Sequence, residues 1–309
     1  MGAIILWQPI VQILEFSVQC NSLLAETIAR YAHIDGTTTT PVTGLKLYRS
    51  ACSVPRQPVM YAPTICVIAQ GAKQIYFGDA ERSYDPANYL INSVTLPVEA
   101  EVLDTDEDHP YLGLSLDVDS YLIGQLLIDM EQQDAAPRQE ADDIIVSTAV
   151  TERLESSFLR LLQCLDTPMD MKVLSPTIRR EIYYEVLQGP HGDILRNCVL
   201  NHTGANRIAP VVHYIEENFE HPLDVDTIAR FAGMSSSTLH DHFKQVTSMS
   251  PMQFVKSLRL HSARTLLLNG NQASEASYRV GYSSPSQFSR EFKRFFGDTP
   301  RDVQAAAAR

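Results

Sequence analysis

Apolar residues near the end of the chain recur at helical spacing. Between Gly281 and Gly297, four phenylalanines fall within about one quadrant of a helix, and polar side chains project from the opposite side. Ser284 is a suitable N-cap and Pro285 suits the first helical position, so a helix is expected to start there. The apolar set is Phe288, Phe292, Phe295 and Phe296, and the polar set is Ser286, Arg290, Lys293 and Arg294. The pattern predicts a helix that packs through phenylalanine and presents cations outward.

The same pattern occurs a second time earlier in the chain. Each copy has a short apolar helix, a glycine turn at Gly233 or Gly281, and then a helix with an apolar inner stripe. At one constant offset, Leu239, Phe243, Lys244 and Pro251 match Phe288, Phe292, Lys293 and Pro300. This arrangement is typical of the helix-turn-helix, whose second helix can lie in the DNA major groove. Two such units are therefore predicted, at about 225–246 and 273–296.

One connecting helix is expected between the two units. Ser250 is its cap, Pro251 its first residue and Asn269-Gly270 its stop, so the helix should cover residues 251–268. At about 1.5 Å per residue it would be roughly 27 Å long, which is near the ~34 Å between successive major grooves on one face of DNA. A single chain could therefore insert two recognition helices side by side.

The pattern differs in the first part of the chain. From about 45 to 118, short β-like runs are broken by turn residues such as Gly71 and Gly78, which predicts an antiparallel barrel or sandwich. From about 119 to 200 the period becomes helical. A leucine-rich stripe there is interpreted as core within the domain, with pairing to a second protomer as the alternative. It comprises Leu154, Phe158, Leu161, Leu162 and Leu165.

Residues 206–309 resemble the DNA-binding domain of the AraC/XylS family of transcriptional regulators along their whole length. The stretch ASYRVGYSSPSQFSREFKRFFGDTPRDV is close to the family signature, and each unit is followed by a proline, Pro251 or Pro300. Other motifs resemble the N-terminal domain of one subgroup of AraC-type regulators, which implies a cupin-like sensing fold. These motifs are Gln70-Gly71-Ala72-Lys73 with Gly78, Tyr89-Leu90, Ser93, Leu96-Pro97 and Pro110-Tyr111-Leu112.

The expected fold is therefore α+β with two domains. Residues 1–203 should form an effector-sensing or dimerisation domain, a cupin-like β-barrel with flanking helices. Residues 204–309 should form an all-α DNA-binding domain. The formal net charge of the chain is -12, yet from residue 204 onward 12 Lys and Arg residues stand against 10 acids. The acidity belongs to the first domain, so phosphate binding is expected to come from a local patch of cations.

Individual residues can be assigned roles on DNA. In the second recognition helix, Ser286, Gln287 and Arg290 take the positions at which the family reads base edges, and Arg290 suits a bidentate contact with guanine. Gln287 could instead only complete the helix cap. The corresponding residues of the first recognition helix are Ser237, Thr238, His240 and Asp241. Contacts with phosphate are assigned to Lys244, Arg279, Lys293 and Arg294.

Asp241 departs from the expected pattern because it takes the place that Arg290 has in the second unit. A carboxylate there repels phosphate and can only accept a hydrogen bond, for instance from cytosine N4. We therefore expect the second unit to supply most of the affinity for DNA, while the first mainly discriminates between sequences.

The sequence gives little indication of catalysis. A metal site of the cupin type needs converging histidines, but the predicted barrel contains only His109. His240 and His242 are two apart on a helix and do not converge, and the acidic run 104–108 lacks the spacing of a calcium loop. No GxSxG, Walker or GxGxxG motif is present. We expect no catalytic residue, no metal site and no cofactor, and a cupin-type enzyme is disfavoured.

Two further features bear on the cellular setting. Five scattered cysteines without a CxxC motif predict reduced thiols in a cytoplasmic protein. The start, MGAIILWQPIVQIL, is apolar but has no basic region and is interrupted by Gln8 and Pro9. Neither a signal peptide nor a membrane span is therefore expected, and the segment is interpreted as a docking segment.

The expected function is that of a sequence-specific transcriptional regulator whose partners are double-stranded DNA and a small-molecule effector in the N-terminal domain. By analogy with the family, an activator that contacts RNA polymerase is favoured, and a homodimer is left open. No residue can be assigned to the effector, because the strand register is unknown. The alternative is a DNA-binding regulator whose N-terminal domain only dimerises or binds a protein partner.

Overall fold

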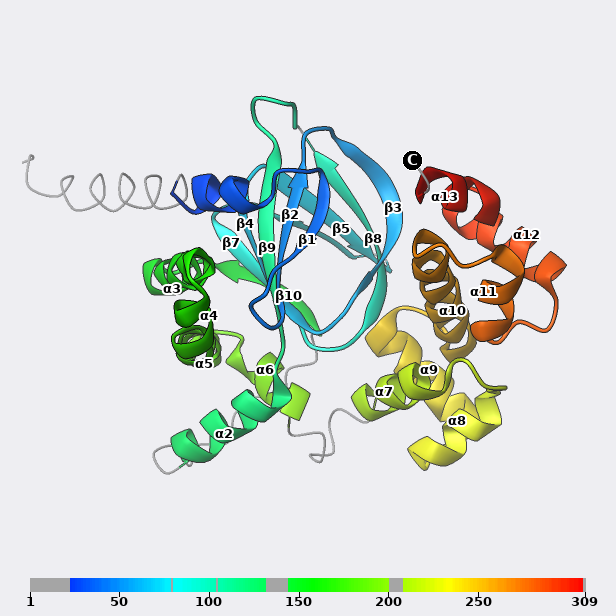
Figure 1. Ribbon diagram of the computed structural model, residues 1–309. Coiled ribbons are helices and arrows are strands. Elements are labelled where there is room, and N and C mark those ends of the chain that lie inside the picture. Colours follow the sequence, from blue (N-terminus) through cyan, green and yellow to red (C-terminus); the bar gives the residue numbers. More distant parts are fainter. Residues whose placement is uncertain (1–22, 79, 104, 132–143, 200–207, 308–309) are drawn as a thin grey trace, which may run out of the picture.

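The computed structural model contains a β-rich region with one group of helices on either side (Figure 1). The structure describes residues 23–78, 80–103, 105–131, 144–199 and 208–307. The apolar start of the chain and the boundary expected near residue 203 lie outside these residues.

The strands form two antiparallel sheets. The first has the order β1-β2-β9-β4-β7-β10 and the second the order β3-β8-β5-β6. The first sheet comprises β1 (Gly36–Thr39), β2 (Leu45–Ser50), β9 (Tyr111–Asp117), β4 (Thr64–Gln70), β7 (Asn88–Asn92) and β10 (Ile145–Ala149). The second comprises β3 (Val54–Tyr61), β8 (Leu96–Leu103), β5 (Ala72–Phe77) and β6 (Ala80–Tyr84). The sheets pack as a cupin-like sandwich.

The sandwich confirms the expected fold class and differs from the sequence prediction in two details. The two sheets do not close into a barrel, because β1 and β10 end one sheet and β3 and β6 end the other. Two strands also lie outside the expected range of 45–118. One is β1, and the other is β10, which pairs antiparallel with β7 and places Val146 opposite Ile91. Strand β10 is only five residues long and lies between α2 and α3 in the sequence. The helical period of the surrounding region therefore masked its strand pattern.

Strand β4, in the middle of the first sheet, is buried on both of its faces. Its side chains alternate between the two faces, as in any strand. Ile65 and Val67 join a buried cluster that contains the helix residue Phe158. On the other face, Ile68 joins Ile75 in a cluster between the sheets. The first sheet is therefore covered on both faces at β4, which explains the nearly continuous apolar run of this strand.

Helices pack on the outer face of the first sheet (Figure 1). They are α2 (Ser120–Glu131), α3 (Glu152–Gln163), α4 (Pro168–Val173), α5 (Ser175–Gln188) and α6 (Gly192–Val199), with a further helix at residues 23–31. The leucine-rich stripe of α3 lies in the cluster shared with the sheet, where Phe158 and Leu162 are fully buried. This burial confirms the interpretation of the stripe as core within the domain.

The C-terminal helices lie beside β3 and β8 of the second sheet (Figure 1). They are α7 (Ala209–Asn218), α8 (Val225–Ala232), α9 (Ser236–Thr247), α10 (Pro251–Leu268), α11 (Ala273–Arg279), α12 (Pro285–Phe296) and α13 (Pro300–Ala307). Helix α10 occupies the residues of the expected connecting helix, and the Ser250–Gln253 capping box fixes its start.

Two buried clusters meet along α10. Phe254 and Leu258 belong to the first, which also contains Leu96 and Val98 of β8. Leu267 belongs to the second, whose members all come from the C-terminal helices and their turns. The first half of α10 therefore shares a core with the second sheet, whereas the fully buried residues of its second half cluster with the helices that follow it.

Candidate nucleic-acid interface and ligand cavity

The first helix-turn-helix consists of α8 and α9, and local hydrogen bonds fix its turn. Asp224 caps α8 by accepting a backbone hydrogen bond of 2.7 Å from the first turn. Gly233 ends α8 with a φ of 62°, a left-handed conformation that glycine adopts readily. Ser235 caps α9, and the Ser236 hydroxyl donates to Asp226 of α8 over 2.7 Å. The two helices are thereby held at a defined angle.

The second helix-turn-helix consists of α11 and α12. Its turn contains Gly281 with a φ of 88°, and a Cβ atom at this position would lie 2.6 Å from the carbonyl oxygen of Glu220. Glycine is therefore required for space as well as for conformation. Ser284 caps α12, as the sequence predicts, and Phe288 and Phe292 are fully buried on its inner side.

Both units are seated on α10 by specific contacts. Phe243 of α9 packs edge-on against Phe254 of α10, with ring centroids 5.4 Å apart. Lys256 of α10 forms an ion pair of 2.8 Å with Glu291 of α12, which also accepts a 3.0 Å hydrogen bond from the Tyr282 hydroxyl. Helix α10 is therefore the common support of the two recognition helices.

Arg259 of α10 links the two units. Its guanidinium donates to the backbone carbonyls of Phe219 and His221 at the end of α7, each over 2.8 Å. A Cβ atom at Gly281 would approach this guanidinium to 3.1 Å. Arg259 therefore lies against both the segment that leads into the first unit and the turn of the second unit. The sequence did not predict this contact.

The residues assigned to DNA all lie at the surface. They are Ser237, Thr238, His240, Asp241 and Lys244 on α9, Arg279 on α11, and Ser286, Gln287, Arg290, Lys293 and Arg294 on α12. Their neighbours Leu239, Phe243, Phe288 and Phe292 are fully buried. Each recognition helix thus packs through its apolar side and presents its polar side outward, as predicted. The individual roles on DNA stay predictions.

The cations of these helices differ in whether they have partners. Among the described residues, the side chains of Arg290, Lys293 and Arg294 make no hydrogen bond or ion pair, and neither does Lys244 on α9. Arg279, by contrast, donates a 3.2 Å hydrogen bond to Asn271. The unpaired cations of α12 are therefore free to contact phosphate or base edges.

Two neighbouring contacts affect the assigned residues. The Gln287 amide donates to Glu291 over 3.3 Å, while the Ser284 hydroxyl accepts a bond from the Gln287 backbone. Its side chain therefore extends along α12. On α9, Nδ1 of His240 lies 3.8 Å from the carboxylate of Asp241. Both contacts involve surface groups, so a base edge can compete for them.

Helix α13 was not expected from the sequence, although a signal for it is present. The Thr299 hydroxyl accepts a hydrogen bond from the backbone of Asp302, and the Asp302 carboxylate accepts one of 2.9 Å from the backbone of Thr299. Together with Pro300 at the first position, this reciprocal cap starts a helix. Its Val303 completes the buried cluster under α12.

A cavity of about 830 Å³ is a second candidate site, and it lies between the sandwich and α10. From the sheets its lining includes Lys46, Tyr48, Val59, Met60, Tyr61, Cys66, Lys73, Tyr84, Tyr111 and Asp117. From α10 it includes Leu258, His261, Arg264, Thr265 and Leu268. Its size is that of a small-molecule site, and both domains contribute walls.

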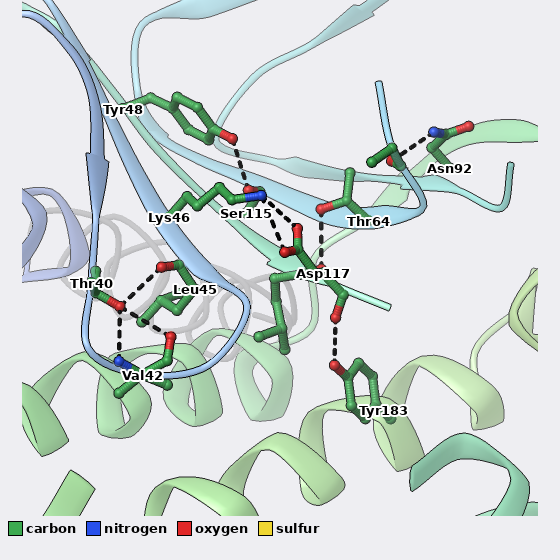
Figure 2. A network of polar contacts seen from close by, with 12 residues as sticks. Thr40, Val42, Leu45, Lys46, Tyr48, Thr64, Asn92, Ser115, Asp117 and Tyr183 are labelled. Atoms are coloured by element: carbon green, nitrogen blue, oxygen red, sulfur yellow. Dashed lines mark hydrogen bonds and ion pairs between the residues drawn. The ribbon is translucent and has the colours of Figure 1, made fainter. Parts of the chain in front are cut away.

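Hydrogen bonds order one wall of this cavity (Figure 2). Lys46 Nζ lies 3.1 Å from both carboxylate oxygens of Asp117. The Tyr48 and Ser115 hydroxyls are 2.9 Å apart, and burial raises the pKa of Tyr48 to about 12. On the far side of the strand, the Tyr183 hydroxyl of α5 donates to the Asp117 backbone carbonyl over 2.6 Å. Helix α5, behind the sheet, therefore stabilises this wall of the cavity.

Comparison with known protein families covers both regions. Residues 41–194 match the family described as the N-terminus of AraC-type transcriptional regulators. Residues 228–306 match a helix-turn-helix domain family, in the region of the two units on α10. The chain belongs to the AraC/XylS family of transcriptional regulators. This confirms the resemblance seen in the sequence.

Within the AraC/XylS family, the chain is 33% identical over 101 residues to the HTH-type transcriptional activator RhaS of Escherichia coli (strain SE11). The match covers 32% of this chain and 36% of RhaS, so the chain aligns with about a third of that relative's length. The same values hold for RhaS of Escherichia coli (strain K12 / DH10B).

Solved structures of ToxT from Vibrio cholerae strain SCE256 share the two-domain fold. An apo variant superimposes with a TM-score of 0.62 at 11% identity, covering 86% of this chain and 99% of ToxT. ToxT with a bound unsaturated fatty acid gives 0.57 at 9% identity, covering 88% and 97%. At such low identity the comparison supports the architecture only.

Membership of the AraC/XylS family also settles the question of catalysis, because the family consists of regulators and not of enzymes. Within the described ranges, no cluster of three or more His, Cys, Asp or Glu residues is placed to hold a metal ion. No helix in the same ranges combines the length and the apolar character needed to cross a membrane.

Proposed function

We propose that this chain is a sequence-specific DNA-binding regulator of transcription that inserts α9 and α12 into successive major grooves. The observation that carries the proposal is the seating of two exposed recognition helices on one helix of 18 residues. That helix is roughly 27 Å long, close to the ~34 Å repeat of the major groove. A modest bend of the DNA or tilt of the helices accommodates the difference.

Arg290 is the proposed reader of a guanine. Its guanidinium is exposed near the middle of α12 and has no competing partner among the described side chains. Lys293 and Arg294 follow on the same helix and are the proposed contacts to phosphates on either side. A bidentate arginine–guanine pair contributes about 1–3 kcal/mol of discrimination between bases.

A binding titration of the full chain against selected DNA, at several salt concentrations, tests this proposal. We expect a selected site that spans two successive major grooves. Arg290→Ala should weaken binding by about 1–3 kcal/mol and relax the preference at one base pair. Arg290→Lys is the matched control, because it keeps the charge and loses the bidentate geometry. Equal weakening on every sequence by Arg290→Ala would reduce this residue to a phosphate contact.

We further propose that a small molecule in the cavity modulates DNA binding. Thr265 and Leu258 of α10 face the same space as Tyr61 and Lys73 of the sheets. A ligand in this space would contact both domains, so its affinity would depend on their arrangement. The bound unsaturated fatty acid in one ToxT structure shows that a protein of this fold holds a small molecule.

The physiological setting is proposed from the relatives. RhaS is named as a transcriptional activator, which favours activation as the role of this chain. Contact with RNA polymerase, in the cytoplasm, is proposed by analogy with the family. A saturable rise in melting temperature with a metabolite would support the sensing role. If a broad metabolite set gave none, the N-terminal domain would instead be a dimerisation or partner-binding module.

A further inference from the structure

The cavity contains two lysines whose electrostatic surroundings differ. Lys46 on β2 has its charge neutralised by Asp117, since both carboxylate oxygens lie 3.1 Å from its Nζ (Figure 2). This pair is complete without a ligand. Any ligand that bound to Lys46 through an anionic group would have to displace an existing ion pair.

Lys73 on β5 has no such partner. Among the described residues, no carboxylate lies within ion-pair distance of its Nζ. The ring of Tyr61 stabilises its charge, with the ring centroid 5.1 Å from Nζ. Burial lowers the pKa of the Lys73 amine. A buried ammonium group without a counter-ion is costly, and an anion beside it removes that cost.

The polar groups on the sheet side of the cavity largely satisfy one another. The Tyr61 and Tyr84 hydroxyls lie 3.1 Å apart, and Tyr48 is bonded to Ser115. Few hydrogen-bonding groups on this side are therefore free for a ligand with many hydroxyls, and Met60 of β3 adds an apolar surface that faces the same space as Leu258 of α10. Helix α10 also contributes Arg264, a second cation, whose Nε atom has no hydrogen-bond partner among the described residues.

We propose that the effector is an organic acid, whose carboxylate pairs with Lys73 and whose apolar or aromatic body lies between the tyrosines of the sandwich and α10. This inference rests on the proposed ligand-modulated function and specifies the class of its ligand. The carboxylate supplies the missing counter-ion. The body reaches Leu258 and Leu268, so that occupancy is communicated to the helix that carries both recognition helices.

Calorimetric titration of the full chain tests the ligand class. The probes are octanoate and 3-phenylpropanoate, each compared with its own primary amide, which has nearly the same shape and no charge. We expect at least one acid to bind at least about tenfold more tightly than its amide, because a charge-assisted bond is stronger than a neutral one. Equal affinity of acid and amide for both pairs would overturn the proposal.

Variants of Lys73 locate the carboxylate. Lys73→Gln should abolish the preference for acid over amide, and Lys73→Arg should preserve it. Lys172→Gln on α4 is the matched control, because this lysine is exposed and does not line the cavity. Retention of the full acid preference by Lys73→Gln, in a sample whose melting curve and DNA binding match the wild type, would overturn the assignment.

DNA titration of the same samples separates this inference from the proposed function. If the unliganded chain binds its selected site and neutral glucose raises its melting temperature while neither acid does, the organic-acid class is wrong and ligand modulation stands. If the chain binds no DNA, the proposed function itself fails, whatever the acids do.

Discussion

The two helix-turn-helix units are built alike but differ in charge and in attachment. Asp241 occupies on α9 the place that Arg290 occupies on α12, and α12 carries two further unpaired cations. The first unit shares a buried cluster with β8 of the N-terminal domain, whereas the cluster of the second contains only C-terminal residues. The unit that we expect to bind phosphate more tightly is therefore the one that shares less core with the N-terminal domain.

This division suggests how a signal would pass from the cavity to DNA. The first unit is also touched from the side by the turn after β5, where a Cβ atom at Gly78 would lie 2.5 Å from the Ser248 hydroxyl at the end of α9. A movement of the second sheet against α10 would thus reach α9 through the buried cluster that it shares with β8, whereas α12 meets the same sheet beside β3. The second unit would then supply most of the affinity for DNA, whereas DNA binding by the first unit would depend on whether the cavity holds a ligand.

The largest effect that would test this division is expected from the two core phenylalanines. Phe243→Ala and Phe292→Ala should each destabilise their surroundings by about 3–5 kcal/mol, because both side chains are fully buried. Only Phe243→Ala should also lower the hydrogen-exchange protection of β8, since Leu96 and Val98 share its cluster.

Urea unfolding followed by hydrogen exchange measures both quantities. Tyr278→Ala is a suitable control, because that side chain on α11 is 59% exposed and its loss should be nearly neutral. If Phe243→Ala left the protection of β8 unchanged, or if Phe292→Ala lowered it equally, the two units would not differ in their attachment to the N-terminal domain.

A smaller effect is expected at the two turn glycines. Gly233→Ala should cost about 1–2 kcal/mol, since a Cβ atom there meets nothing within 4 Å and only the left-handed backbone opposes it. Gly281→Ala should cost clearly more, because its Cβ atom would also approach the Glu220 carbonyl to 2.6 Å. Chemical denaturation of both variants measures the two losses in free energy of unfolding. Equal losses would mean that the Glu220 carbonyl and the Arg259 guanidinium move aside easily to admit the new Cβ atom.

The sequence predicted the C-terminal domain better than the sandwich, and the reason is physical. Caps and helical periods act over a few residues, so Ser284 and Ser250 were enough to place the starts of α12 and α10. The brace at Arg259 escaped prediction because it joins the carbonyls of Phe219 and His221 about forty positions away, a contact without a local pattern.

The cavity could not be predicted for a related reason. Lys73 faces inward because of the register between β5 and β8, in which it lies opposite Val102. A shift of one residue would have turned it outward. The pairing of β10 with β7 depends likewise on residues more than fifty positions apart in the chain. The pattern of apolar residues indicated strands here, but only the pairing of the strands in the structure showed which side chains line the cavity.

The smallest effect is expected from Asp241, and it bears most directly on the comparison between the units. Its carboxylate is exposed on α9, and among the described residues its one ionic contact is with the neighbouring His240 at 3.8 Å, so its removal should leave stability nearly unchanged. On DNA, loss of a negative charge near phosphate should strengthen binding to non-selected sequences by less than about 1 kcal/mol. Binding to the selected site should gain less or weaken, because a base contact is lost together with the repulsion.

Parallel titrations of Asp241→Ala against the selected site and a scrambled duplex measure this difference. Asp241→Asn sharpens the test, since it removes the charge but keeps an oxygen that can accept from cytosine N4. The asparagine variant should therefore retain more sequence preference than the alanine variant. Were Asp241→Ala to strengthen binding to both duplexes equally, Asp241 would act only by repulsion, and the first unit would lose its proposed discriminating role while keeping its core contact with the N-terminal domain.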